Sequence, residues 1–335
     1  MKSARPVILA LLLLLSVVSL AVAQAPATLA ERLFFELWSD NSYRSTNFGA
    51  DEPAYREDDF FQPAYREEDY LLSQLSLQAG LRTAVADSLF FDMRLSFELT
   101  GDWANEEWND AYWNNMVAWG PGARLSYETS AEEDENRALW VSDFNAEFFA
   151  DLLFSDDSPD QGKERIPALD ARDNFRTGLS VWSAIDSREM FSGAMSLWAE
   201  IWAEAAYETT AFAEEPAEDF YPLNLDILAG PQFPVGRIAV QPYAAITVSC
   251  DLGDEAWNKE PWLNNVTWGP GFRLSMGDLV PIAEADLYLY AEYLEVDYFS
   301  RVDEESYAYS ADEDFRAGIE LYLPFGATRD RIKRH

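Results

Sequence analysis

The feature that most constrains the fold of this chain is a strict alternation of apolar and polar residues over many segments. In the segment 91–99, large apolar side chains occupy every odd position and polar or charged side chains every even position. The segments 285–292 and 315–325 have the same two-residue period. This period is typical of a β-strand with one apolar and one polar face, whereas an amphipathic helix repeats apolar residues at spacings of three and four. The sequence therefore predicts an all-β fold.

The alternation predicts twelve strands, six in each half of the sequence. Short links follow the second, sixth, eighth and tenth strands, and longer links follow the odd-numbered strands. The link between the fourth and fifth strands is longer than this pattern requires. The expected strands are 31–40, 70–82, 89–102, 115–128, 139–154, 173–185, 190–207, 221–232, 236–251, 264–276, 281–298 and 312–325.

The expected strand 190–207 is also compatible with a helix. Trp198, Ile201 and Ala205 recur at helical spacing, and the Ala and Glu content of the segment favours helix. The same segment alternates, with Glu200 and Glu204 on the face opposite Ile201. We expect it to be a strand.

An internal repeat relates the two halves of the chain. Residues 108–126 recur without a gap as 257–275, so that the motif Trp119-Gly120-Pro121-Gly122 returns as Trp268-Gly269-Pro270-Gly271. Later in each half, Phe175-Arg176-x-Gly178 returns as Phe315-Arg316-x-Gly318. The period is far longer than the about 20 to 50 residues of solenoid repeats. The sequence predicts two similar six-strand halves, about 31–185 and 190–326.

The N-terminus has the pattern of a secretory signal peptide. Lys2 and Arg5 precede an apolar run over 7–20, and Ala21-Val22-Ala23 follows as a cleavage site. The run is shorter than the about 20 residues that span a bilayer as a helix. We expect residues 1–23 to be removed and the mature chain to be exported. Cys250 is the single cysteine, so no disulfide can form within the chain.

The chain is strongly acidic. Sixty Asp and Glu residues stand against 24 Lys and Arg residues, for a formal net charge of −36. Such a chain repels phosphate backbones, which excludes nucleic acid as an expected partner. The acids cluster between strands, as at 132–135 and 156–160, and a tandem copy at 53–60 and 63–70 is also acidic. We expect solvated surface loops there, with cation binding as the alternative.

The export signal, the even number of alternating segments and the alternation of long and short links resemble the bacterial outer-membrane β-barrels as a class. The resemblance covers the whole mature chain. It implies one closed antiparallel up-and-down barrel of about 12 strands over 24–326, located in the bacterial outer membrane. Its partners would be outer-membrane lipid and the assembly machinery, with no cofactor. The last expected strand ends at Phe325, and a short basic periplasmic tail, 327–335, would follow it.

Charged residues on the polar face of the strands would line the lumen of such a barrel. One interpretation is a salt-bridge network that braces the barrel, because charges buried in a lumen must pair or be hydrated. The other is a narrow pore selective for small polar solutes. The expected lumen-lining residues are Arg32, Glu36, Arg82, Asp92, Arg94, Glu98, Arg124, Glu147, Asp151, Arg176, Glu200, Glu204, Asp226, Arg273, Asp286, Glu292, Arg316 and Glu320.

The tryptophans suggest an interfacial role. The Trp-Gly-Pro-Gly motif is expected to bend or bulge its strand at the barrel rim, because proline removes a ladder donor. Tryptophans near the strand ends are typical of the aromatic girdle at a membrane interface, and sugar stacking is the alternative. The expected interface residues are Trp108, Trp113, Trp119, Trp257, Trp262 and Trp268.

Catalysis is not predicted. Glu200 and Glu204 would share a face, as a glycosidase carboxylate pair does, but alternating acids are normal on a lumen face. His335 is the only histidine, which argues against Ser-His hydrolases and most zinc sites. No catalytic or metal-binding residue is expected. The predicted function is a passive channel for small polar solutes or a structural surface protein. The alternative is a secreted soluble β-protein of two related domains that binds carbohydrate through its tryptophans.

Overall fold

The structure is a computed structural model, and the part of the chain that it describes is built of β-strands. It describes residues 32–48, 67–103, 116–130, 139–157, 171–187, 193–212, 218–253, 264–276, 285–299 and 311–326. The expected signal peptide and basic tail lie outside these ranges. The strands are β1 Leu33–Phe48, β2 Glu67–Ala86, β3 Leu89–Asp102, β4 Met116–Ser130, β5 Leu139–Asp157, β6 Ala171–Ser187, β7 Ser196–Phe212, β8 Glu218–Phe220, β9 Pro222–Val235, β10 Ile238–Asp251, β11 Asn265–Ser275, β12 Asp286–Tyr298 and β13 Ala311–Gly326.

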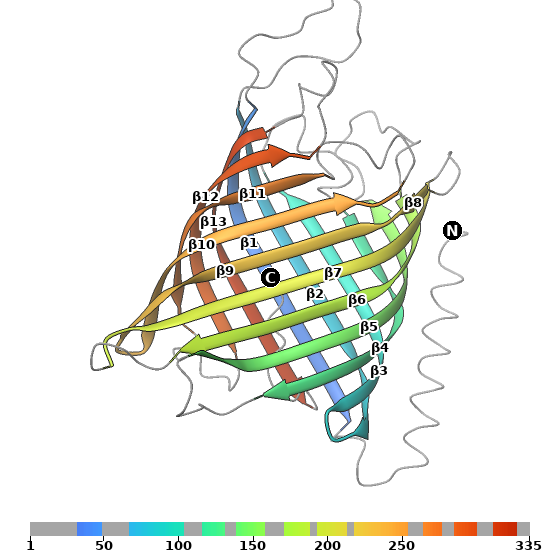
Figure 1. Ribbon diagram of the computed structural model, residues 1–335. Coiled ribbons are helices and arrows are strands. Elements are labelled where there is room, and N and C mark those ends of the chain that lie inside the picture. The colour runs from blue at the N-terminus through green and yellow to red at the C-terminus, as the bar shows by residue number, and fades with distance from the viewer. Residues whose placement is uncertain are drawn as a thin grey trace, which may run out of the picture.

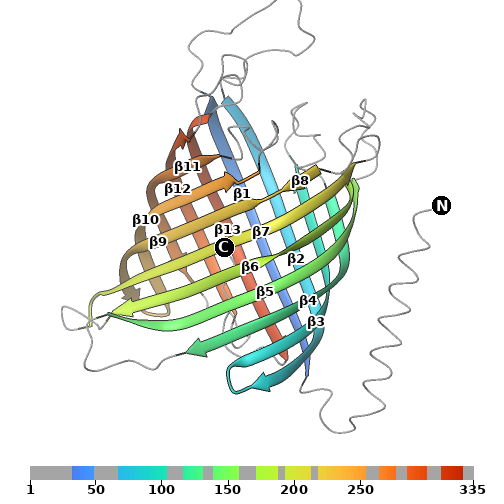
Figure 2. The ribbon, with the colours of Figure 1, turned by 45° about the vertical axis from the view of Figure 1, so that its right-hand side comes forward.

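The strands form one closed antiparallel barrel (Figure 1). Each long strand pairs with its neighbours in the sequence, and β1 pairs with β13 to join the two ends of the chain. The pairing of β6 with β7 completes the circle, as Figure 2 shows from a second direction. A closed barrel leaves no unpaired sheet edge. The predicted all-β, up-and-down barrel is confirmed. Among the described residues there is no helix long and apolar enough to cross a membrane.

The short strand β8 belongs to the same barrel position as β9. Glu208 of β7 pairs with Phe220 of β8, and Ala205 of β7 pairs with Leu223 of β9, so both pairings follow one continuous register. Only Tyr221 interrupts the strand between them. The barrel therefore has twelve strand positions around its circumference, as the alternation predicts.

The segment 190–207, whose composition is also compatible with a helix, forms a strand from Ser196 onward. β7 runs from Ser196 to Phe212 and pairs along its length with β6. Its cross-strand partners explain the outcome, because pairing on both sides of a barrel overrides the weak helix propensity of Ala and Glu. β7 begins six residues later than the expected start at 190, and β1 continues to Phe48, well past the expected end at 40.

The Trp-Gly-Pro-Gly motif does not shift the pairing register of its strand. In β4, Trp119 to Gly122 lie opposite Phe97 to Arg94 of β3 in unbroken register. In β11, the second copy lies opposite β10 in the same regular manner. The expectation of a bulge at this motif is therefore wrong. On the opposite side, the ladders with β5 and β12 skip the Gly-Pro pair of each motif and resume in the same register, so the missing N–H is accommodated without a change of register.

The outer and inner faces of the barrel have opposite chemistry. The outer face carries exposed apolar side chains on every long strand, as a surface in contact with lipid requires. These side chains include Phe35, Leu71, Phe91, Leu125, Phe148, Leu179, Leu197, Phe233, Ile246, Phe272, Leu289 and Ile319. A soluble two-domain protein would bury such side chains in its core, so this distribution argues against the soluble alternative.

Candidate functional site in the lumen

The inner face is identified by contacts between strands that are not neighbours. Arg124 of β4 reaches Glu36 of β1 at 3.2 Å, although β2 and β3 lie between these strands. Arg273 of β11 reaches Glu200 of β7 at 3.0 Å, past β10 and β9. Such contacts must cross the interior of the barrel. They define two clusters, which we call the Arg124 network and the Arg273 network.

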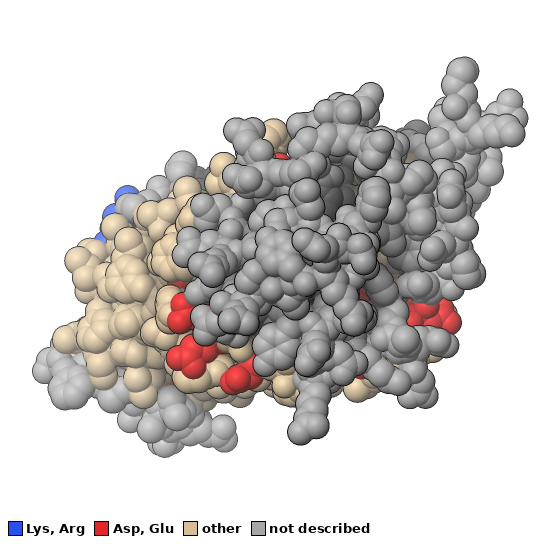
Figure 3. All heavy atoms as spheres, turned by 90° about the horizontal axis from the view of Figure 1, so that it is seen from above, with Lys and Arg blue, Asp and Glu red and all other residues tan. Residues whose placement is uncertain are grey.

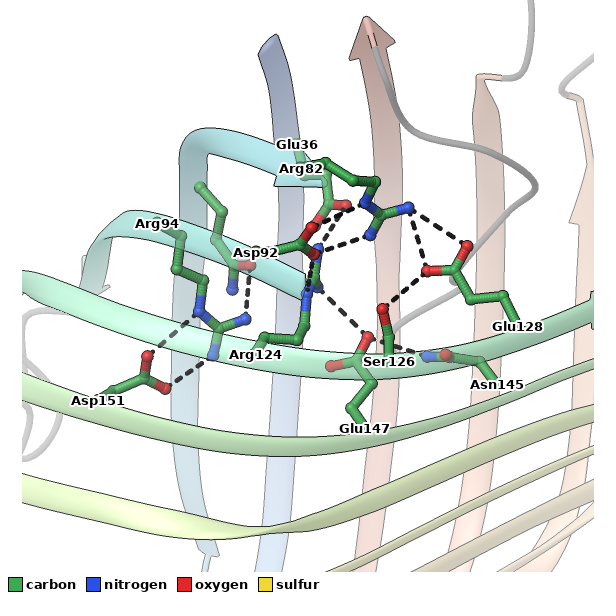
Figure 4. Close-up of polar contacts among 11 residues, drawn as sticks. Glu36, Arg82, Asp92, Arg94, Arg124, Ser126, Glu128, Asn145, Glu147 and Asp151 are labelled. Carbon is green, nitrogen blue, oxygen red and sulfur yellow. Dashed lines mark hydrogen bonds and ion pairs between the residues drawn. The ribbon is translucent and has the colours of Figure 1, made fainter. Parts of the chain in front are cut away.

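The Arg124 network begins with a shared carboxylate (Figure 4). Arg82 of β2 donates hydrogen bonds from Nε and Nη2 to the two carboxylate oxygens of Asp92 of β3, each at 2.9 Å. Arg124 donates Nε to Oδ2 of the same Asp92 at 2.7 Å. Arg82 also pairs with Glu128 at 3.0 Å. Each strand contributes these side chains from alternating positions, which is why they meet on one face.

Further carboxylates surround the same cluster. Arg124 pairs with Glu147 of β5 at 3.3 Å in addition to its contacts with Glu36 and Asp92. Arg94 forms a bidentate pair with Asp151, with donor–acceptor distances of 3.1 and 2.7 Å. The Arg124 network thus consists of Glu36, Gln78, Arg82, Asp92, Arg94, Arg124, Glu128, Glu147 and Asp151.

The Arg273 network combines one ion pair with aromatic rings. Glu200 accepts hydrogen bonds from both terminal nitrogens of Arg273, at 3.0 and 3.3 Å. Gln241 accepts a third hydrogen bond, from Nε of Arg273, at 2.8 Å. The guanidinium lies 4.3 Å from the ring centres of both Trp198 and Tyr288. Contacts of this kind attract a cation to the faces of the rings.

The second glycine of each Trp-Gly-Pro-Gly motif makes room for these networks. A Cβ at Gly122 would overlap the carboxylate of Asp151, which is held by Arg94. A Cβ at Gly271 would overlap the ring of Tyr243, whose hydroxyl donates to Glu292 at 2.8 Å. The motif therefore allows a large side chain from the adjacent strand to lie across its own strand.

Smaller polar contacts line the regions of the inner face between the two networks. Arg176 of β6 pairs with Glu204 and with Glu208, the latter at 2.7 Å. On the other side of the barrel, Tyr290 donates to Asp40 at 2.9 Å. Two further contacts there are Trp38 Nε1 to Glu320 at 3.1 Å and Arg316 to Asp314 at 2.6 Å.

The charges of the two networks are removed from solvent. Asp92 has an exposed fraction of 0%, and Arg124 has 1%. Burying an unpaired charge costs several kcal/mol, so pairing and bidentate geometry are what make this arrangement stable. These groups are therefore covered by other atoms and packed into the inner wall on this side of the barrel. The structure thus shows a braced inner wall.

The structure also places the remaining expected residues. Glu98, Asp226 and Asp286 lie on the inner strand faces. Arg32 precedes β1 and is exposed, so the structure does not bring it into either network. Glu128 and Gln241 were not among the expected lumen residues. Each lies on the polar face of an alternating strand, and this position could have identified it as a lumen residue.

The two described tryptophans of the motif lie on the outer face. Trp119 packs against Phe154 with ring centres 5.1 Å apart, and Trp268 donates Nε1 to Asp297 at 3.3 Å. The other four expected interface residues, Trp108, Trp113, Trp257 and Trp262, lie outside the described residues.

The described residues contain no arrangement suited to metal binding, since no three His, Cys, Asp or Glu side chains among them form a group that could hold an ion. Glu200 and Glu204 are bound to different arginines, Arg273 and Arg176. They are also four positions apart on a strand, about 13 Å along its axis at the usual rise. Each of the two carboxylates therefore belongs to a separate ion pair.

Comparison with known proteins finds no family for this chain and a weak likeness to several solved structures. No family model matches the chain and no curated protein matches it. The translocator domain of the autotransporter NalP from Neisseria meningitidis is 8% identical, with a TM-score of 0.33, and the match covers 95% of this chain and 96% of that chain. An outer membrane channel from Pseudomonas putida F1 is 11% identical, with a TM-score of 0.45, over 90% of this chain and 99% of that chain. LpxR from Salmonella typhimurium is 10% identical, with a TM-score of 0.36, over 86% and 99%. The resemblance of this chain to bacterial outer-membrane β-barrels rests on its own closed strand pairing and apolar outer face.

Proposed function

We propose that this protein is a narrow passive channel of the bacterial outer membrane, for small polar solutes and with a preference for cations. The observation that carries the proposal is the charge of the inner face. Acidic residues there outnumber arginines, and the described strands carry no lysine. The inner acids include Glu36, Asp40, Asp92, Glu98, Glu128, Glu147, Asp151, Glu200, Glu204, Glu208, Asp226, Asp286, Glu292, Asp314 and Glu320, against Arg44, Arg82, Arg94, Arg124, Arg176, Arg273 and Arg316.

A wall with excess negative charge concentrates cations and repels anions within a low-dielectric tube. In the view from above, the described acidic groups that are visible lie at several places and the described basic atoms at one edge (Figure 3). Twelve strands lie between the filled barrels of about eight strands and the open porins of sixteen. The two buried networks narrow the lumen further, so the pore would admit only small solutes.

The location follows from the same features. Exposed apolar side chains all around the barrel would contact lipid, and the N-terminal signal peptide predicted from residues 1–23 would direct export. We expect the assembly machinery of the outer membrane to insert the chain.

The test is to express the chain with its signal, separate soluble and membrane fractions, and compare boiled with unboiled samples on a gel. The detergent-extracted protein is then placed in planar bilayers under a salt gradient. We expect a membrane-bound, heat-modifiable band, small single-channel steps and a reversal potential of cation-selective sign. A soluble product or an anion-selective pore contradicts the proposal.

A structural surface barrel is the second candidate. The complete burial of Asp92 and the near-complete burial of Arg124 favour it, because a lumen packed in this way braces the wall. A heat-modifiable membrane protein without conductance steps would select this candidate and reject the channel.

A further inference from the structure

The strand pairing follows the same register in β1–β6 and in β7–β13. This is seen by following cross-strand partners on the inner face of each half, where each strand contributes the residue opposite the last. The run is Phe34, Gly80, Arg94, Gly122, Asp151 and Arg176 in the first half, and Trp198, Gly230, Tyr243, Gly271, Glu292 and Arg316 in the second. Arg176 pairs next with Glu208, and Arg316 pairs next with Arg44, in each case ten residues along the strand from the start of the other run. Because this stagger is the same at both joins of the closed barrel, corresponding residues of the two runs lie at a common level. Arg124 and Arg273, each two residues after the motif glycine of its strand, therefore occupy corresponding positions.

The two arginines also make corresponding contacts. Nη2 of Arg124 binds Oε1 of Glu36 at 3.2 Å, and Nη2 of Arg273 binds Oε1 of Glu200 at 3.0 Å. Glu36 and Glu200 each lie two residues beyond the aromatic residue of the common level, so they correspond as well.

The remaining contacts of the two arginines agree in the same way. Nε of Arg124 donates to Asp92 on the preceding strand, and Nε of Arg273 donates to Gln241 on its preceding strand. Each guanidinium also lies over the aromatic ring of the common level, at 5.5 Å from Phe34 for Arg124 and at 4.3 Å from Trp198 for Arg273. The two arginine side chains therefore extend across the lumen from corresponding positions on β4 and β11 to corresponding glutamates, Glu36 and Glu200.

Each contact passes two intervening strands and is shielded from water. The side chain of Arg124 is 0% exposed and that of Arg273 is 3% exposed. Because both contacts lie at the same level, in opposite halves of one closed barrel, they narrow the lumen from two sides at one depth. We propose that Arg124 and Arg273 together form the constriction that sets the size of the pore. This inference rests on the proposed channel function.

The two sides of the constriction differ in how firmly they are held. Arg124 is bound by three carboxylates, those of Glu36, Asp92 and Glu147. Arg273 is bound by one carboxylate, that of Glu200, and otherwise by an amide and two rings. Removing Arg124 would take a cation away from three buried carboxylates, whereas removing Arg273 would take one away from a single carboxylate. Arg273 is therefore the position at which the constriction can be opened with the least damage to the fold.

The experiment is single-channel recording of the double variant Arg273→Ala with Glu200→Gln, which removes the guanidinium and neutralises the carboxylate left behind. The control is Arg237→Ala, because Arg237 is an exposed arginine in the turn between β9 and β10. Conductance through a narrow pore rises with its free cross-section, so we expect an increase of about twofold or more for the double variant and no change for the control. A folded, heat-modifiable double variant with the conductance of the unmodified protein overturns the inference.

A second variant, Glu200→Ala, keeps Arg273 and its two rings and removes only the far end of the contact. We expect larger or noisier open-channel current from it, because the guanidinium loses its fixed position. An unchanged current trace from a folded Glu200→Ala barrel also overturns the inference. If the unmodified barrel does not conduct and the variants do, the constriction is supported, and the proposal that the unmodified protein is an open channel is rejected. If the unmodified barrel conducts and the variants conduct equally, the channel stands and the constriction is rejected.

Discussion

Arg124 and Asp92 form an ion pair inside the barrel in which both side chains are fully shielded from water. The Nε of Arg124 lies 2.7 Å from Oδ2 of Asp92, and the exposed fraction of both side chains is 0%. Asp92 simultaneously accepts two hydrogen bonds from Arg82. One carboxylate therefore balances two buried guanidinium groups on different strands, which makes it the residue on which the Arg124 network depends most.

Replacing Asp92 by Asn should destabilise the barrel strongly. The substitution preserves the shape of the side chain but leaves two buried arginines with less compensating charge, and breaking a buried pair in this way costs about 3–5 kcal/mol. The measurement is the free energy of unfolding in lipid vesicles, followed by the gel shift between folded and unfolded bands. Asp87→Asn is the matched control, because Asp87 lies exposed in the turn between β2 and β3. Equal stability of the two variants would contradict the role assigned to Asp92.

Replacing Gly271 by Ala should disturb the ring that lies over it. The new methyl group overlaps Tyr243, which must move away from Glu292, and forced repacking of this kind costs about 1–3 kcal/mol. Unfolding in lipid vesicles measures the loss. The control is Gly101→Ala, since the atoms nearest to a Cβ at Gly101 are 3.7 Å away, an ordinary contact distance. A Gly271→Ala protein as stable as Gly101→Ala would show that the ring does not need the space.

Replacing Glu98 by Gln should weaken the cation preference of the proposed channel. Glu98 lies on the inner face of β3, where its removal subtracts one negative charge from the wall. The reversal potential in a salt gradient reports the change, which we expect to be a shift toward zero with little change in stability. Ser39→Ala, on the outer face of β1, should leave the reversal potential unchanged. A Glu98→Gln pore with the unmodified reversal potential would indicate that selectivity resides elsewhere.

The barrel itself is predictable from the sequence because the period of the apolar residues reports which face of each strand points outward. That signal is repeated in every strand, so an error at one strand end does not change the fold. The outcome at β7 illustrates this point. Its composition favours a helix, yet pairing with β6 and β9 on either side determines a strand.

The partners within the lumen are less accessible to prediction. The sequence places Arg124 and Glu36 on the inner face, but their contact depends on the tilt of the strands and on the register across two intervening strands. The Trp-Gly-Pro-Gly motif was misread for a related reason. Its glycines suggested a bulge, whereas Gly122 and Gly271 provide space for side chains from the neighbouring strands, which a local pattern does not reveal.

The outer face provides the last prediction. Leu179 lies near the middle of β6 and is 51% exposed, whereas Val85 lies near the turn end of β2 and is 59% exposed. If this face contacts lipid, the cost of an arginine depends on depth, at about 2–4 kcal/mol near the bilayer midplane and about 0–1 kcal/mol near an interface. Leu179→Arg should therefore be destabilised much more than Val85→Arg when unfolding is measured in lipid vesicles. In water the two substitutions would differ little, because both side chains are already exposed. Equal effects of the two substitutions in vesicles would therefore contradict a membrane-spanning position for β6.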